Sequence, residues 1–243
     1  MKFEMISSYL AQLNLSVFHA INGLAGRSLS LDRLMSQLES YSLKGLVMMA
    51  FFGMLWFRPG LDQSLRRKIL LLQPFAIGLT VLAIRSISVF VPFTIRPMYA
   101  IDAGFRPLLV KVAYNLEDWS SFPSDQAGMM FALATGFWLA SKKAGFLFFM
   151  FSIVTMFARI YVGIHFPSDI LVGATIGTAA SFILNVKSVR EFITRPLLAV
   201  ERGRPAFFYG CFFAVLYETG IVFENVRRIG KAVLHVLSGT YSF

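Results

Sequence analysis

The sequence predicts an all-α membrane protein in which about six transmembrane helices form one bundle, with amphipathic helices at both ends of the chain. Two observations predict this fold. Of the 243 residues, 56% are hydrophobic and only 15% are charged, whereas soluble domains are typically about 25% charged. The apolar residues also gather in long stretches separated by short polar or basic segments. We therefore expect a single membrane-embedded domain over residues 1–243.

The N-terminal segment, residues 1–42, is amphipathic. Leu13, Val17 and Ile21 recur at the spacing of one helix face, and Asn14 lies between them. This pattern predicts one or two helices that lie along the membrane interface without crossing it. The segment has no basic region followed by an apolar region and a cleavage site, so we predict no removable signal peptide.

Six apolar segments follow and form the predicted transmembrane core, residues 43–223. A helix that crosses the roughly 30 Å hydrocarbon core needs about 20 apolar residues, so the first of the six is short. The remaining tail, residues 224–243, is predicted to form another amphipathic helix. The six predicted spans cover residues 43–57, 69–91, 125–141, 145–163, 168–186 and 206–223.

The positions of the basic residues predict the orientation of these spans. Loops 58–68, 142–143 and 187–204 hold eleven lysines and arginines in 31 positions, whereas the other twelve are spread over the remaining 212. Because basic loops stay in the cytoplasm, we expect these three loops inside and residues 92–124 and 163–168 outside. The basic tail would then lie outside, contrary to the rule. Dispersed basic residues also argue against a nucleic-acid partner.

Residues 159–169 combine three side chains that suit attack on phosphorus. Arg159 has a planar fork of donors that matches phosphate oxygens. His165 can attack phosphorus, and Asp169 can accept the other ring N–H and fix the tautomer. Each residue alone is better explained as a structural feature, namely a snorkelling arginine, an interfacial histidine and a carboxylate at a helix start. Together, on one membrane face, they favour a phosphate site.

A second motif, Phe-Pro-Ser-Asp-Gln at residues 122–126, precedes an apolar helix. Free backbone N–H groups and the positive end of the helix dipole make such a helix start an anion site. Ser124 or Asp125 could equally cap the helix, and the two roles are compatible. Arg96, before Pro97 in the same outer loop, could clamp further phosphate oxygens.

These motifs resemble those of the type 2 phosphatidic acid phosphatase family of membrane lipid phosphatases. The family pattern is Lys-x6-Arg-Pro, then Pro-Ser-x-His, then Ser-Arg-x5-His-x3-Asp, and the resemblance covers roughly residues 85–185. It implies that His165 is the nucleophile and that Asp169 orients it. This chemistry requires no metal or other cofactor. The phosphate-binding residues implied by the resemblance are Arg96, Ser124, Asp125 and Arg159.

Three positions depart from the family pattern. Ala158 replaces a serine, and Val89 replaces the lysine, although Arg85, one helical turn earlier, could bind the same phosphate. Gln126 replaces the histidine that protonates the leaving group in the family. Glutamine can donate a hydrogen bond but cannot transfer a proton, and the loss of a general acid typically costs about 10²–10⁴-fold in rate. An active protein should therefore favour lipid diphosphates, whose leaving group is already a stable anion, over monoesters.

The predicted function is hydrolysis of a lipid phosphate or a polyprenyl diphosphate, such as undecaprenyl diphosphate, through a phospho-histidine. We expect the site to lie on the periplasmic or outer face of the cytoplasmic membrane. A phosphotransferase would use the same residues. A catalytically silent lipid-phosphate-binding protein is a further alternative, which Gln126 supports and the His165–Asp169 pair opposes. The predicted partners are the substrate lipid and the bilayer, and the sequence does not predict an oligomeric state.

Overall fold

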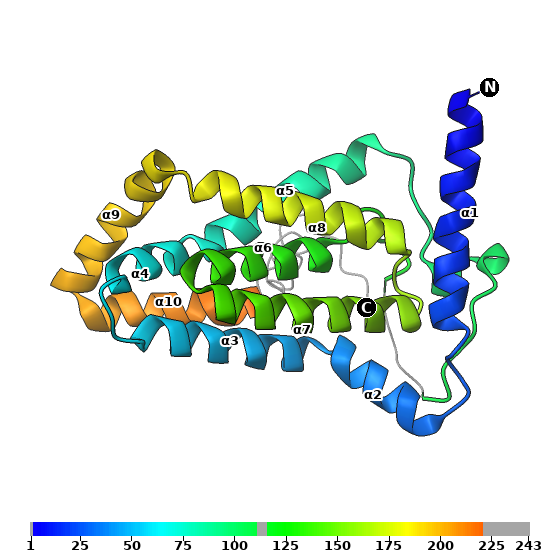
Figure 1. Ribbon diagram of the computed structural model, residues 1–243, viewed down its shortest axis with the longest axis horizontal. Helices are drawn as coiled ribbons and strands as arrows, with labels where there is room; N and C mark the ends of the chain where they lie inside the picture. The colour runs from blue at the N-terminus through cyan, green and yellow to red at the C-terminus, as the bar shows by residue number, and fades with distance from the viewer. Residues whose placement is uncertain (1, 111–115, 221–243) are drawn as a thin grey trace, which may run out of the picture.

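The computed structural model describes residues 2–110 and 116–220, which form an all-α bundle without any strand in those two ranges (Figure 1). The predicted fold class is confirmed. Two short 3₁₀ helices, Pro97–Tyr99 and Ile101–Ala103, lie in the long loop between α5 and α6. The α-helices are α1 (Lys2–Asn22), α2 (Leu29–Glu39), α3 (Tyr41–Phe57), α4 (Gln63–Leu71), α5 (Gln73–Phe90), α6 (Asp125–Ala140), α7 (Lys142–Tyr161), α8 (Pro167–Leu184), α9 (Lys187–Gly203) and α10 (Pro205–Gly220).

All six predicted spans contain a helix, but these helices differ in length. Within the described ranges, three helical segments are long and apolar enough to cross a membrane, namely Gln63–Phe90, α7 and α8. α2 and α3, which bend by 53° where they meet, would together make a fourth. α6 and α10 have 16 residues each, which corresponds to about 24 Å of helix and is short of the roughly 30 Å core.

The second predicted span, residues 69–91, begins differently from the prediction. Its first residues belong to α4, which already starts at Gln63 inside the predicted polar loop, and a break at Leu72 separates α4 from α5. Pro74 lies in the first turn of α5, where its missing N–H does no harm, so it favours a new helix start at this point. The end of the sixth predicted span and the predicted tail helix, residues 221–243, lie outside the described residues.

α6 lies at the centre of the bundle, against α5, α7 and α8. Glycines allow α6 and α8 to approach closely. A Cβ atom on Gly177 would lie 1.8 Å from the carbonyl oxygen of Gly128, and one on Gly173 would lie 2.2 Å from that of Ser124. No larger residue fits at either position without moving a backbone, so the small residues set the separation of the two helices.

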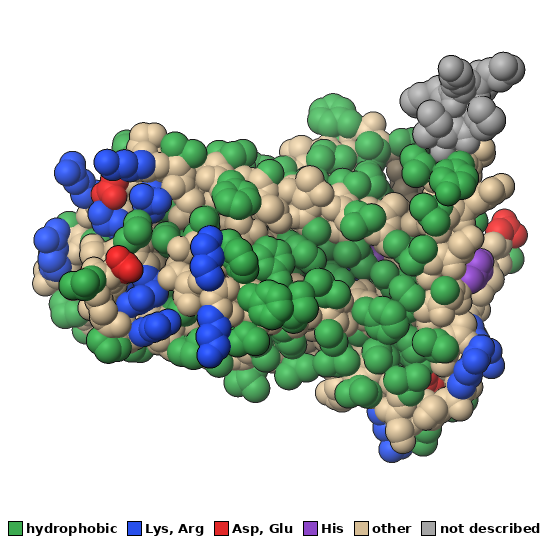
Figure 2. Space-filling view, in the orientation of Figure 1, with side chains coloured by type: hydrophobic (Ala, Val, Ile, Leu, Met, Phe, Trp, Pro, Cys, Tyr) green, Lys and Arg blue, Asp and Glu red, His purple; other side chains and the backbone are tan. Residues whose placement is uncertain are grey.

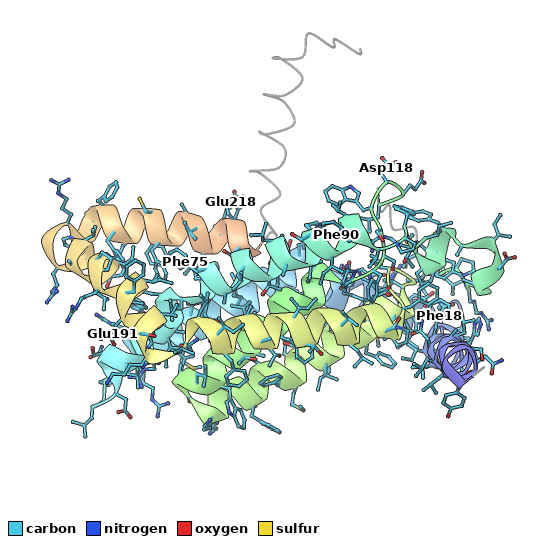
Figure 3. The ribbon with its side chains drawn as sticks, turned by 90° about the horizontal axis from the view of Figure 1, so that it is seen from above. Phe18, Phe75, Phe90, Asp118, Glu191 and Glu218 are labelled. Carbon is cyan, nitrogen blue, oxygen red and sulfur yellow. The ribbon has the colours of Figure 1, made fainter. Side chains whose placement is uncertain are left out.

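The two ends of the bundle differ in charge. Many lysine and arginine side chains gather at the end where α9 and the start of α4 lie (Figure 2). There, Arg67 pairs with Glu201 at 3.1 Å and Lys68 with Glu191 at 2.7 Å, which ties α4 to α9. Asp118, in the long loop before α6, lies at the opposite end from Glu191 (Figure 3). The basic loops and the loops that carry the candidate site are thus separated along the bundle.

α1 runs across the end of the bundle that carries the candidate site, roughly perpendicular to α7 and α8 (Figure 1). Phe18, which is fully buried, packs edge-on against Phe166 with ring centroids 5.4 Å apart. Asn14 Oδ1 accepts a hydrogen bond from the backbone N–H of Ser168 at 2.9 Å. One contact falls on the α7–α8 connection and the other on the first turn of α8, so α1 packs against the segment that contains His165.

Candidate active site

The His165 imidazole, between α7 and α8, has polar partners at both of its nitrogens. Nε2 lies 3.1 Å from Nη1 of Arg96, a group that can only donate, so Nε2 is the unprotonated nitrogen. Nδ1 lies 3.3 Å from the Ser121 hydroxyl and 3.5 Å from Oδ2 of Asp169. Nδ1 therefore carries the proton, and the lone pair of Nε2 is the one available for attack.

Asp169 is held by donors from two segments of the chain. Its Oδ2 atom accepts hydrogen bonds from the Ser121 hydroxyl at 2.6 Å and from the backbone N–H of Phe166 at 2.9 Å. Ser121 thereby bridges Asp169 and His165. It connects the segment just before residues 122–126 to the motif at residues 159–169. Ser121 is not among the site residues that the sequence predicts. Its signal was its place in a Ser-Ser pair directly before the Phe-Pro-Ser motif.

The surroundings of His165 keep its ring neutral. Burial, together with the nearby charges of Arg159 and Arg96, lowers the pKa of His165 to about 4, although the hydrogen bond to Asp169 raises it. Burial also lowers the pKa of Arg96 to about 10, which leaves this arginine charged at neutral pH. A neutral imidazole beside a charged guanidinium is the combination that a phosphorus nucleophile requires.

The Phe-Pro-Ser-Asp-Gln motif at residues 122–126 forms the start of α6 and is hydrogen-bonded to the motif at residues 159–169. The hydroxyl of Ser124 caps α6 by accepting from the N–H of Ala127 at 3.3 Å. The backbone N–H of Ser124 donates to the carbonyl oxygen of Asp169 at 3.0 Å. The capping role of Ser124 is therefore realised, and the helix start lies beside the segment that carries the nucleophile.

Asp125 and Arg85 neutralise each other in this structure. They form an ion pair, and the Arg85 guanidinium also lies 4.4 Å from the ring centroid of Trp119. The sequence predicts phosphate binding for both residues. The structure brings both to the second motif, but Asp125 serves as the counter-ion of Arg85, and a carboxylate would repel a phosphate.

Arg159 extends to a second group of buried polar side chains. Its Nη1 atom pairs with Glu39 and donates to Oε1 of Gln126 at 2.6 Å. Lys44 donates to the same Gln126 oxygen and lies 3.5 Å from Glu39. We call Glu39, Lys44, Gln126 and Arg159 the Gln126 cluster, and each of its members is at most 4% exposed.

Neither Glu39 nor Lys44 is predicted from the sequence to be a site residue. Lys44 lies just inside the first predicted span, and an ionisable residue within a membrane segment is in itself a sign of function. Glu39 falls at the end of α2, in a segment that the amphipathic pattern placed at the interface. No local pattern could have paired it with Arg159, from which 120 positions separate it.

The site contains buried hydrogen-bond donors without a partner among the described residues, and it contains more basic than acidic side chains. Three buried donor nitrogens have no hydrogen-bond partner among the described residues: Arg96 Nε, Gln126 Nε2 and Arg159 Nε. Unpaired buried donors are unfavourable, and oxygens of a bound anion would satisfy them. The basic side chains gathered here are Arg85, Arg96, Arg159 and Lys44, and the carboxylates are Glu39, Asp125 and Asp169. When all seven are ionised, four cations face three anions, which favours an anionic ligand.

Within the described residues, no group of three or more histidine, cysteine, aspartate or glutamate side chains could hold a metal ion. Five of the predicted site residues fall into two adjoining sets. Arg96 and Asp169 flank His165, and Gln126 with Arg159 belongs to the Gln126 cluster.

Comparison with known proteins identifies the family. The sequence profile of the PAP2 superfamily matches residues 70–192, about half of the chain. The chain is 27% identical over 173 residues to undecaprenyl-diphosphatase BcrC of Bacillus subtilis, which covers 70% of this chain and 82% of that protein. It is 30% identical over 96 residues to the putative undecaprenyl-diphosphatase YbjG of Escherichia coli, covering 38% and 47%.

The fold also resembles a solved structure. The crystal structure of Aquifex aeolicus LpxE matches with a TM-score of 0.51 and 29% identity, over 70% of this chain and 93% of that one. Together with the helical segments that are long enough to cross a bilayer, these matches indicate a multi-pass membrane protein. The chain belongs to the PAP2 superfamily of phosphatases.

Proposed function

We propose that this protein is a membrane lipid phosphatase that cleaves a polyprenyl diphosphate or a lipid phosphate through a phospho-histidine on His165. The observation that carries the proposal is the state of the imidazole: its Nε2 lone pair faces the Arg96 guanidinium, while Nδ1 is backed by Asp169 and Ser121. Two relatives that are named undecaprenyl-diphosphatases support a polyprenyl diphosphate as the substrate.

The geometry suggests how each residue acts. Nε2 of His165 attacks phosphorus, and the bond from phosphorus to the leaving oxygen breaks. Arg96 transfers its hydrogen bond from Nε2 to a phosphate oxygen as the attack begins. Asp169 stabilises the charged ring that results, as carboxylates do in comparable triads. Water then attacks the phospho-histidine and releases inorganic phosphate.

The separation of the basic loops from the site supports a location of the reaction at the outer face. If the basic end of the bundle lies in the cytoplasm, His165 lies at the outer face of the cytoplasmic membrane. A substrate whose head group reaches that face, with its hydrocarbon chain in the bilayer, would approach the site from the membrane.

Phosphate release by the purified protein in lipid vesicles tests the proposal. We expect release from undecaprenyl diphosphate, slower release from phosphatidic acid, and loss of both in His165→Ala. His19→Gln, on α1, is the matched histidine control and should retain activity. Unchanged phosphate release by His165→Ala would show that His165 is not the nucleophile. Transfer of phosphate only to an added alcohol would identify a phosphotransferase, and no turnover at all would favour the silent binding protein.

A further inference from the structure

The Gln126 cluster is a buried group of charged side chains that the nucleophilic half of the mechanism does not use. Its two basic side chains, Lys44 and Arg159, share one carboxylate, Glu39, so the cluster carries one uncompensated positive charge when both are protonated. A buried charge without compensation is unfavourable unless a ligand neutralises it. The cluster therefore suits an anion of its own.

The orientation of the Gln126 amide is fixed by its neighbours. Lys44 and Arg159 can only donate, so the oxygen of the amide must face them. The Nε2 atom consequently points the other way, where it is buried and has no partner among the described residues. Gln126 thus holds two cations with its oxygen and presents an unused N–H₂ group to the site.

This second anion position lies next to the first. Gln126 belongs to the first turn of α6, and the N-cap of that turn, Ser124, is hydrogen-bonded to the backbone of Asp169 at 3.0 Å. Arg159 of the cluster also lies close enough to Arg96 and His165 for its charge to lower the pKa of both groups. The Arg96–His165 pair and the Gln126 cluster therefore form two neighbouring sites for anionic groups.

A small cavity begins at Lys44 and Gln126, and most of its remaining lining is apolar. Its volume of about 20 Å³ is enough for roughly one water molecule. The apolar side chains that line it are Met48, Met129, Met130 and Leu133. Methionine adapts its shape readily, so this wall can accommodate the first carbons of a lipid bound beside Lys44.

We infer that the Gln126 cluster binds the second, lipid-bearing phosphate of a diphosphate substrate, with Lys44 as its principal cation. This inference rests on the proposed function. His165 forms the P–N bond to the terminal phosphorus, the P–O bond to the bridging oxygen breaks, and its electron pair leaves with the lipid monophosphate. Lys44 and the Gln126 N–H₂ group stabilise that anion, so no proton has to be transferred to it. A glutamine in place of the histidine of the family therefore suits this leaving group.

Binding of non-hydrolysable probes tests the inference without requiring turnover. Calorimetry on the purified full chain would compare methylenediphosphonate, which has two phosphoryl groups, with inorganic phosphate, which has one. We expect Lys44→Met to weaken methylenediphosphonate binding by about 10–100-fold, as expected for the loss of a charge-assisted contact, and phosphate binding by less than about 3-fold. Lys44→Arg should retain most of the affinity for methylenediphosphonate.

The matched control is Lys68→Met, which removes a lysine from an ion pair at the opposite end of the bundle and should leave both affinities unchanged. Misfolding lowers the number of binding sites but not the ratio of the two affinities, so the ratio reports on Lys44 itself. An equal effect of Lys44→Met on both probes, or no effect on either, would overturn the inference. If Lys44→Met changes the affinity ratio as expected but the unaltered protein releases no phosphate from any lipid, the proposed hydrolysis is overturned and the inferred binding site is retained.

Discussion

At the scale of single residues, the chemistry depends on an imidazole that stays neutral although it lies beside a carboxylate. Asp169 alone would favour a protonated ring, yet burial and two nearby arginines outweigh it and lower the pKa of His165 to about 4. The ring therefore keeps its nucleophilic lone pair well below the pH at which an exposed histidine is protonated.

The protonation state of His165 can be measured directly. As the pH falls, His165 should remain neutral through 6.5, the ordinary histidine value, and become protonated only near pH 4, when attack is no longer possible. NMR of protein with ¹⁵N-labelled histidine, with His165→Asn for assignment, would locate the midpoint. A midpoint near 6.5 would show that burial and the two arginines do not control this ring.

At the scale of secondary-structure elements, the connection between α7 and α8 determines where His165 points. Gly163 has a φ of +79°, in the left-handed region, and its carbonyl oxygen accepts a hydrogen bond from the N–H of Met98 at 2.9 Å. A Cβ atom at this position would lie 2.3 Å from the ring of Phe105. The turn thus requires glycine for its conformation and for its space.

Gly163→Ala should lower both stability and activity. The left-handed conformation costs a residue with a side chain roughly 1–2 kcal/mol, and displacement of Phe105 adds to this. We expect a lower midpoint of thermal unfolding in detergent and a larger loss of phosphate release, because His165 moves with the turn. Gly78→Ala, in α5, where a Cβ meets nothing within 4 Å, is the matched control. If both variants behave alike, the turn has no special role.

The helices were predictable from sequence because long apolar runs end at recognisable signals. The predicted 125–141 and 168–186 correspond to α6 and α8 within two residues, where Ser124 caps one helix and Pro167 opens the other. The pairing of His165 with Asp169 was also predictable, because one helical turn separates them.

The environment of Arg159 was not predictable, because its partners come from distant parts of the chain. Glu39 and Gln126 lie 120 and 33 positions away. Their meeting depends on how α2 and α3 pack against α6 and α7, which no local spacing encodes. The departure from the family pattern at Gln126 is visible in the sequence. Lys44 and Arg159, the two cations that contact Gln126, cannot be recognised as its neighbours from the sequence, because they come from distant parts of the chain.

At the scale of the whole molecule, charge and site lie at opposite ends of the bundle. Asp118 lies in the long loop at the end that carries the site, and Phe192, which is 83% exposed, lies on α9 at the basic end. If the basic end is cytoplasmic, these two positions are on opposite sides of the membrane.

Cysteine labelling in intact cells tests this orientation. The native cysteine, Cys211, is exposed and would first be replaced by alanine. A membrane-impermeant maleimide should then label Asp118→Cys and leave Phe192→Cys unlabelled until the membrane is opened. The opposite pattern would place the site in the cytoplasm and exclude substrates that are presented at the outer face.

The close contact of α6 and α8 has a consequence for how such proteins diversify. Because backbone meets backbone at Gly128 and Gly177, and again at Ser124 and Gly173, the start of α6 and the start of α8 are held at a fixed separation. Glu39 and Lys44, two members of the Gln126 cluster that we assign to the leaving group, come instead from helices outside this pair. Lipid preference can therefore change through the N-terminal helices while the reacting core is preserved.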